Sequence, residues 1–182
     1  MIDFGGALKP SMGGPVQNIM RLGTRYAVDV TIPQMHAEPD GRVWAAKLRM
    51  GKLYGVVCRF YQDNFNPGSP GTPVVNGADQ TGSVLNLKGF TAAYAIRVGQ
   101  AFSVITNGKR YLYFAASDAT VAANGTVTLP IFPMIRKSPA DGDTAEFAAP
   151  YIQGSLSGNE VAWDRLTGGV YNFGTISVSE DE

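Results

Sequence analysis

Apolar and polar residues alternate most regularly between residues 25 and 32. The apolar positions lie two residues apart, at Tyr26, Val28, Val30 and Ile32. A period of two places successive side chains on opposite faces of a sheet, so this spacing predicts a strand with one buried face. Pro33 follows directly and ends the predicted strand.

The one helix that the pattern predicts covers residues 42–53, after a turn-like Glu-Pro-Asp-Gly segment. At about 100° per residue, its apolar side chains form two stripes on nearly opposite sides. One stripe holds Val43, Ala46, Met50 and Leu53, and the other holds Trp44 and Leu48. We expect the first stripe to face the sheet of the same subunit. The second stripe then needs another cover, either a loop of the chain or a neighbouring subunit.

Basic residues gather in and just after this helix. Residues 42–59 hold five bases and no acid, namely Arg42, Lys47, Arg49, Lys52 and Arg59. Two interpretations of such a run stay open, a solvated face and an interface with a partner.

Short strands separated by turn signals are predicted for most of the remaining chain. They cover residues 54–61, 84–87, 101–106, 109–115, 126–132, 143–148, 151–156, 161–166 and 170–178. Residues 1–24 are rich in glycine and show no helical or strand period, so we expect an irregular arm there. Residues 64–73 hold three prolines and two glycines, which indicates a subdomain boundary. The predicted fold class is therefore mainly β with one helix.

The strongest local signal is a hairpin centred on Asn107-Gly108. Both residues tolerate the positive φ of a type I′ turn, which joins two strands through a two-residue loop. Such a loop pairs Val104 with Tyr111 and Phe102 with Tyr113.

Two other residues interrupt predicted strands. Pro130 cannot donate a ladder hydrogen bond, which predicts an edge strand or a bulge over residues 126–132. Gly174 lies where the apolar parity of residues 170–178 switches, as a bulge requires.

Charge and cysteine content narrow the possible functions. The 15 basic and 15 acidic residues balance, so we expect no nucleic-acid partner. One cysteine and one histidine allow neither an internal disulfide nor a Cys/His zinc site. No apolar run is long enough for a membrane anchor, and the N-terminal residues lack a secretion signal. Only 16% of the residues are charged, against about 25% in ordinary proteins, which indicates either a surface covered by neighbours or a turn-rich β protein.

Motifs for catalysis are absent from the sequence. His36 precedes a turn and is expected to be a loop residue, and residues 154–158 carry Leu156 where a nucleophile elbow needs serine. Asp141, Asp143 and Glu146 lack the order of a calcium loop and indicate a solvated turn. A carboxylate pair for glycoside hydrolysis stays open because its members need only be close in space. We expect no catalytic, metal or cofactor-binding residues and no cofactor.

Several stretches together resemble the distal tail proteins of long-tailed bacteriophages. They are residues 21–33, the helix around 44–48, 82–89, 98–104, 110–112, 125–133 with Arg136, and the closing aromatic strand before the acidic end. The resemblance implies a tail-tube-like β-sandwich with one helix and a small inserted β-barrel of oligonucleotide/oligosaccharide-binding type. Residues 1–65 and 157–182 would form the ring domain, and residues 66–156 would form the inserted barrel.

The same resemblance implies a non-enzymatic role. Such proteins form hexameric rings in the virion tail tip, where they join the tail-tube protein to the tip hub. The protein would be made in the host cytoplasm and would bind copies of itself. The residues expected at interfaces are Arg42, Trp44, Lys47, Leu48, Arg49, Lys52, Pro130, Glu180, Asp181 and Glu182.

Three alternatives stay open beside this interpretation. The chain could be another phage tail or neck structural protein. It could be a carbohydrate-binding β module, which would present aromatic side chains on one concave face, with Tyr94, Tyr111, Tyr113, Tyr151 and Trp163 as candidates. An enzyme such as a cell-wall hydrolase is the third alternative, although no motif points to it.

Overall fold

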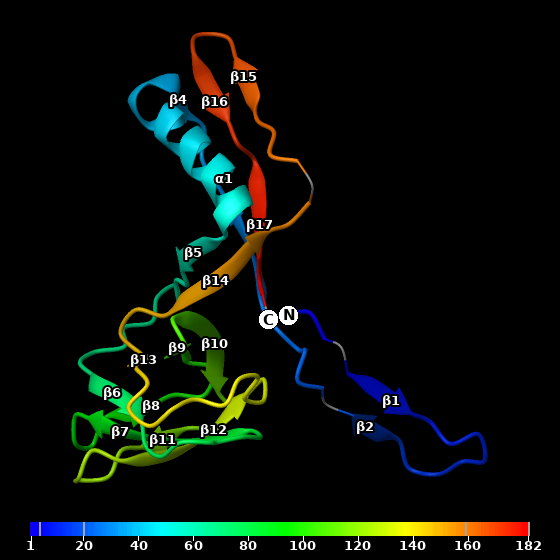
Figure 1. Ribbon diagram of the computed structural model, residues 1–182, viewed down its shortest axis with the longest axis vertical. Helices are drawn as coiled ribbons and strands as arrows, with labels where there is room; N and C mark the ends of the chain where they lie inside the picture. The colour runs from blue at the N-terminus through cyan, green and yellow to red at the C-terminus, as the bar shows by residue number, and fades with distance from the viewer. Residues whose placement is uncertain (4, 20, 159, 182) are drawn as a thin grey trace.

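The computed structural model describes residues 1–3, 5–19, 21–158 and 160–181. The protein is mainly β, and its described residues contain a single α-helix, which confirms the predicted fold class at this level. Figure 1 shows a barrel at one end, a layer of helix and sheet at the other, and a hairpin arm that projects sideways.

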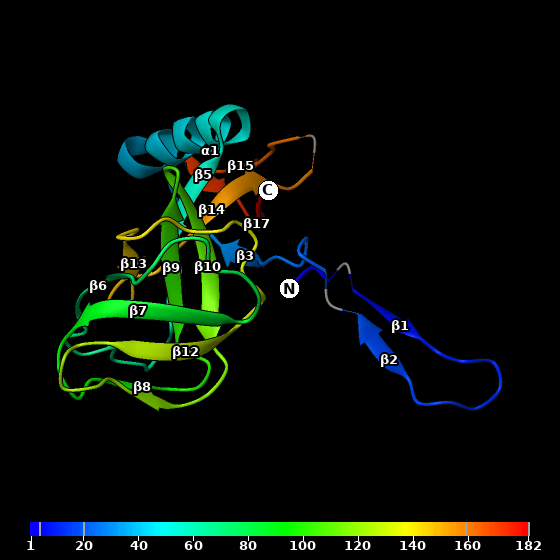
Figure 2. The same cartoon turned by 60° about the horizontal axis from the view of Figure 1, so that its bottom comes forward.

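The barrel is a six-stranded antiparallel sheet in the order β13-β9-β10-β12-β7-β6. Its strands are β6 (Gly71–Val75), β7 (Val84–Phe90), β9 (Ala101–Thr106), β10 (Lys109–Ala115), β12 (Val127–Phe132) and β13 (Ala145–Glu146), and the short pair β8 (Ala95–Ile96) and β11 (Ala119–Thr120) lies beside it. The two ends of the sheet meet where Val74 bridges to Thr144 and the Val75 amide donates to the Asp143 carbonyl at 2.8 Å. The sheet is therefore nearly closed, and Figure 2 shows its strands wrapping round one interior.

The predicted hairpin is confirmed within the barrel. Val104 pairs with Tyr111 and Phe102 with Tyr113, and both turn residues have positive φ, 51° at Asn107 and 75° at Gly108. Inward-facing side chains from all sides fill the interior, where Phe102 stacks on Phe147 with ring centroids 4.4 Å apart.

The second part of the body is a layer of helix on sheet, which we call the helix layer. A four-stranded sheet in the order β3-β17-β14-β5 carries the helix, and a three-stranded sheet, β15-β16-β4, lies beyond it. The bounds are β3 (Ala27–Thr31), β4 (Met35–His36), an irregular turn η1 (Ala37–Gly41), α1 (Arg42–Tyr54), β5 (Val56–Arg59), β14 (Tyr151–Leu156), β15 (Asp164–Leu166), β16 (Val170–Asn172) and β17 (Thr175–Glu180). The core of this layer lies between α1 and the four-stranded sheet, and it also includes Ala101 and Leu112 from the barrel strands β9 and β10.

The helix packs against the sheet through the side on which Leu48 lies. The sequence analysis assigned that side to another cover and expected the opposite stripe to face the sheet. Ala45, Leu48 and Gly51 are buried, whereas Met50 and Leu53 are exposed. An apolar pattern is read mainly from large side chains. In this helix, however, small residues face the sheet, and they let the helix lie close to it. A Cβ on Gly51 would lie only 2.8 Å from a methyl carbon of Val56.

Strand pairing also differs from three other expectations. Strand β14, which the sequence analysis grouped with the inserted barrel, pairs with β5 and β17 of the helix layer. Strand β12 is an interior strand, so the edge position predicted from Pro130 is wrong; the ladder with β10 begins only at Ile131, after the proline. Gly174, with φ of 64°, separates two strands of different sheets instead of forming a bulge within one.

The N-terminal region is a hairpin, where the sequence analysis predicted an irregular arm. Strands β1 (Gly6–Leu8) and β2 (Gln17–Ile19) pair with each other, and all six strand residues are exposed. We call residues 6–19 the arm. At its base, the two chain segments are joined by the bridge between Ile2 and Arg25 and by a hydrogen bond from the Thr24 hydroxyl to Asp3, just before β3 begins.

Candidate assembly surface

An apolar groove lies between the C-terminal half of α1 and strand β5. It has a volume of about 430 Å³ and is lined by residues of α1, β3, β5, β14 and β17. Its lining includes Trp44, Met50, Tyr54, Val57 and Cys58, and Lys47 is the only charged member. The groove exists because α1 packs through small residues and leaves its larger apolar side chains at the rim.

Large apolar side chains of α1 and β5 are exposed along this groove. Met50 is 53% exposed, Tyr54 85% and Val57 49%, and all three line the groove. We call these three residues the α1–β5 face. A group of exposed apolar side chains around a groove marks an interaction site in a soluble protein.

Strand β5 adds backbone groups to the same face. It lies at one end of the four-stranded order, and its described pairing is with β14 alone. An edge strand presents unpaired N–H and C=O groups, which can bind a further strand from another chain.

The bases of the helix do not form a free positive face. Arg42 pairs with Glu38 at 2.5 Å, Lys47 lies over the Trp44 ring, and Arg49 lies over the Trp163 ring. The Lys52 ammonium donates to the carbonyls of Leu156 and Gly158. Each of these four bases thus has a contact within its own subunit, while Arg42, Lys47 and Arg49 remain exposed, so a solvated face and an interface both stay open as interpretations.

The joint between barrel and helix layer is built on a buried ion pair. The Arg136 guanidinium, which follows β12, donates to both carboxylate oxygens of Glu180 at 2.7 and 2.9 Å. The same carboxylate accepts the backbone amides of Tyr26 at 2.9 Å and Leu112 at 2.7 Å. The two side chains are 6% and 1% exposed, so this network ties the last strand of the chain to the barrel.

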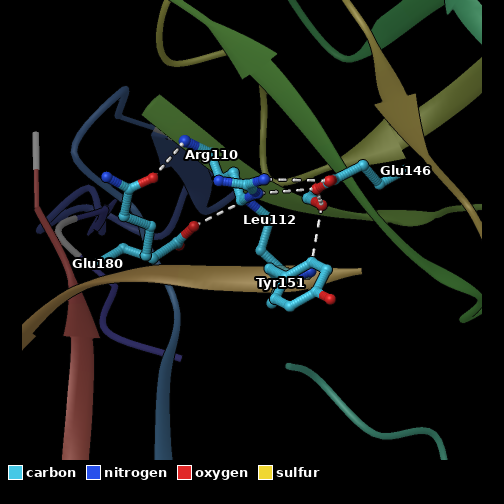
Figure 3. A network of polar contacts seen from close by, with 7 residues as sticks. Arg110, Leu112, Glu146, Tyr151 and Glu180 are labelled. Atoms are coloured by element: carbon cyan, nitrogen blue, oxygen red, sulfur yellow. Dashed lines mark hydrogen bonds and ion pairs between the residues drawn. The ribbon is translucent and has the colours of Figure 1, made fainter. Parts of the chain in front are cut away.

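A second polar network lies beside the first (Figure 3). Arg110 donates to Glu146 at 3.0 and 3.3 Å, and the Ser103 hydroxyl donates to the same carboxylate at 2.6 Å. The Tyr151 amide donates to that hydroxyl, and the Arg110 amide donates to the Gln153 side chain. Strands of the barrel are thereby attached to β14 of the helix layer.

Burial at the joint changes several pKa values. Burial and the Glu180 carboxylate raise the pKa of Tyr26 to about 12, and burial raises the pKa of Tyr113. Burial works against the charged form of Arg136, but its bonds to Glu180 outweigh this and raise its pKa. The Arg136 guanidinium therefore stays charged at neutral pH, and its pairing with Glu180 acts as a structural clamp.

The predicted interface residues are distributed over separate places. Trp44, Lys47 and Leu48 all line the groove, but Leu48 is only 4% exposed and packs in the core. Its own subunit therefore covers it, one of the two covers that the sequence analysis left open. Glu180 is buried in the joint, so it is not the exposed interface residue that was expected. Asp181 accepts a hydrogen bond from the Ser155 hydroxyl, and Glu182 lies outside the described residues.

The aromatic residues proposed for sugar binding do not share an exposed face. Tyr111 and Tyr113 are buried in the barrel, and the Tyr94 hydroxyl donates to the Pro67 carbonyl. The Arg110 guanidinium lies over the Tyr151 ring, and Trp163 packs with Tyr171 and Phe173. These contacts are the packing expected of core and joint residues.

The acidic residues that were considered for a calcium loop each bind a different partner. Asp141 pairs with Lys88, while Asp143 and Glu146 bind other partners, which is consistent with the predicted solvated turn for Asp141. Lys88 and backbone amides lower the pKa of Asp141. Within the described ranges, no three His, Cys, Asp or Glu side chains are grouped so that they could hold a metal ion. No helix in the same ranges has the length and apolar character to cross a membrane.

The most prominent surface features are thus an apolar groove, a free strand edge and a projecting hairpin. Neither a family model nor a curated protein matches the chain. Sequence reasoning missed the free edge of β5 and the Arg136–Glu180 clamp, because nothing in the local sequence shows which strands pair or which distant charges meet.

Proposed function

We propose that the chain is a non-enzymatic virion protein, a distal tail protein that forms a ring between the tail tube and the tail-tip hub of a long-tailed bacteriophage. The α1–β5 face is the observation that carries the proposal. It combines exposed apolar side chains with an unpaired strand edge, and a lone subunit would leave both in water.

The arm supports the same proposal. A two-stranded hairpin is marginally stable in water unless it packs against something else. All the strand residues of the arm are exposed, and its described hydrogen bonds between strands are internal. Such an element is typical of a protein whose final fold is completed in an assembly.

The tail-tip role rests on the sequence resemblance, and the mainly β architecture with one helix and a barrel accords with it. Copies of the chain would meet through the α1–β5 face, the tail-tube protein and the tip hub would cover the two sides of the ring, and the virion would be its final location. A closed ring follows when one surface of each copy binds a different surface of the next.

Native mass spectrometry of the purified protein, alone and with its tail-tube protein, tests the ring directly. We expect a hexamer in at least one of the two samples, and electron microscopy of virions should locate it at the tail tip. A monomer at every concentration in both samples would overturn the proposal.

A surface variant separates assembly from folding. Tyr54→Glu places a charge on the α1–β5 face and should abolish the hexamer while leaving the thermal midpoint nearly unchanged. Val84→Glu is the matched control, because Val84 is also exposed but lies in β7 of the barrel. Equal effects of the two variants on assembly would exclude a specific role for the face.

A further inference from the structure

The arm has one apolar face. Its register pairs Gly6 with Ile19 and Leu8 with Gln17, so these four residues share one side of the hairpin. Leu8 and Ile19 lie diagonally across that side, and they are 56% and 36% exposed. The opposite side carries Ala7 and Asn18. The arm therefore presents two large apolar side chains that the described residues of its own subunit cover only in part.

The arm and the groove match in chemistry. Residues 6–19 contain one charged residue, Lys9, and the groove lining contains one, Lys47. Burying one surface against the other removes apolar area from water without trapping an unpaired carboxylate. The hairpin also has free strand edges, and β5 has one too, so backbone hydrogen bonds can join them.

The positions of arm and groove favour contact between different copies. The arm leads into β3, whereas the edge that could accept a further strand belongs to β5, and these strands form opposite edges of the four-stranded sheet. In both Figure 1 and Figure 2 the arm points away from the body. A donor at one edge and an acceptor at the other make a head-to-tail contact, which generates a ring when its rotation closes.

We infer that the arm of one copy adds to the free edge of β5 in the next copy and covers its apolar groove with Leu8 and Ile19. This inference rests on the proposed ring, for which it names the connecting element and its docking site. The occupant of the groove is thus a second copy of this chain.

Cys58 provides a natural probe, because it lines the groove and is the only cysteine of the chain. One protein carries Leu8→Cys with Cys58→Ala, so its thiol lies on the arm alone. It is mixed with the unaltered protein, whose thiol lies in the groove alone, and treated with a short bismaleimide. We expect a cross-linked pair containing one chain of each kind, which mass spectrometry should map to residues 8 and 58.

The control replaces Val84 instead of Leu8, again with Cys58→Ala, and places the thiol on β7 of the barrel. We expect at least tenfold less mixed pair from it. In a single chain that holds both Leu8→Cys and Cys58, linkage within one chain would show that the arm folds back onto its own groove and would overturn the inference.

Assembly of two arm variants provides an independent readout. Leu8→Asp should prevent the hexamer, whereas Asn18→Asp on the opposite side of the same hairpin should leave it intact. A hexamer that survives Leu8→Asp, without a mixed cross-link, overturns the arm contact and leaves the proposed ring standing. If the unaltered protein stays monomeric with and without the tail-tube protein and gives no mixed pair, both proposals fail.

Discussion

The barrel and the helix layer differ in how completely they bury their apolar side chains. In the described residues, sixteen buried side chains form the barrel cluster and three partly buried ones pack against it. The helix-layer cluster holds nine buried side chains and twelve partly buried ones. A closed sheet can seal its interior by itself, whereas a four-stranded sheet under one helix leaves its margins open. The barrel is thus complete as a single chain, and the helix layer offers its surface to partners.

Removing the clamp between the two regions should have the largest effect. Glu180→Ala leaves the Arg136 guanidinium and two backbone amides buried without their acceptor, and we expect a loss of about 3–5 kcal/mol in the free energy of unfolding. Urea denaturation followed by circular dichroism measures it. The matched control is Asp181→Ala, the next residue, which is exposed.

The double variant Arg136→Met with Glu180→Leu should recover much of this loss, because a buried ion pair can be replaced by apolar packing. If Glu180→Ala proves as stable as the control, the two regions do not depend on the clamp.

Truncation in the closed core should be nearly as costly. Phe147→Ala removes a ring stacked on Phe102, and we expect a loss of about 3–5 kcal/mol in unfolding free energy. Trp163→Ala, in the half-buried aromatic group of the helix layer, should cost clearly less. Equal losses would mean that the helix layer is packed as completely as the barrel.

Two leucines of α1 sharpen the comparison within one helix. Leu48→Ala should destabilise the subunit by about 2–5 kcal/mol because Leu48 is buried. Leu53→Ala should change its stability by no more than about 0.5 kcal/mol because Leu53 is exposed. Thermal denaturation of both variants measures the difference, and a large effect of Leu53→Ala would place that side chain in the core.

The smallest predicted effect is a pH dependence at the joint. The pKa of Tyr26 is about 12 in the folded protein against an ordinary value of 10.0, so folding favours the protonated phenol. Its contribution is fully present below pH 10 and is lost as the pH rises toward 12. In Tyr26→Phe the thermal midpoint should therefore fall less steeply over that pH interval. Part of the fall should remain, because burial also raises the pKa of Tyr113.

An unchanged decline in Tyr26→Phe would indicate that another group causes it. Tyr26 is a suitable position for this test because its hydroxyl has no hydrogen-bond partner among the described residues, so phenylalanine removes no bond.

Local sequence signals predicted the elements that local chemistry determines. The Asn107-Gly108 turn fixed the register of its hairpin, and the helix was predicted within one residue of its observed end. The facing of that helix was not predictable from large apolar residues, because Ala45 and Gly51 make the closest approach. The arm was missed because its strands have three residues each and no buried face.

The candidate surface was harder to predict than the fold. Trp44 and Lys47 were expected at an interface and do line the groove, but the free edge of β5 depends on which strand ends the sheet. The clamp joins residues 44 positions apart in the sequence, and Glu180 was expected at an interface, not in a buried ion pair. Long-range pairing of this kind comes from the topology and not from any local period.

The chain passes from the helix layer into the barrel and returns to the helix layer at one place. Strands β5 and β14 are neighbours, and the Phe60 amide donates to the Pro150 carbonyl at 2.8 Å where the excursion starts and finishes. A tight turn at that place could also join the two strands. Replacing the barrel by such a turn would remove Arg136 and leave Glu180 without its cation, so the replacement would also have to change residue 180.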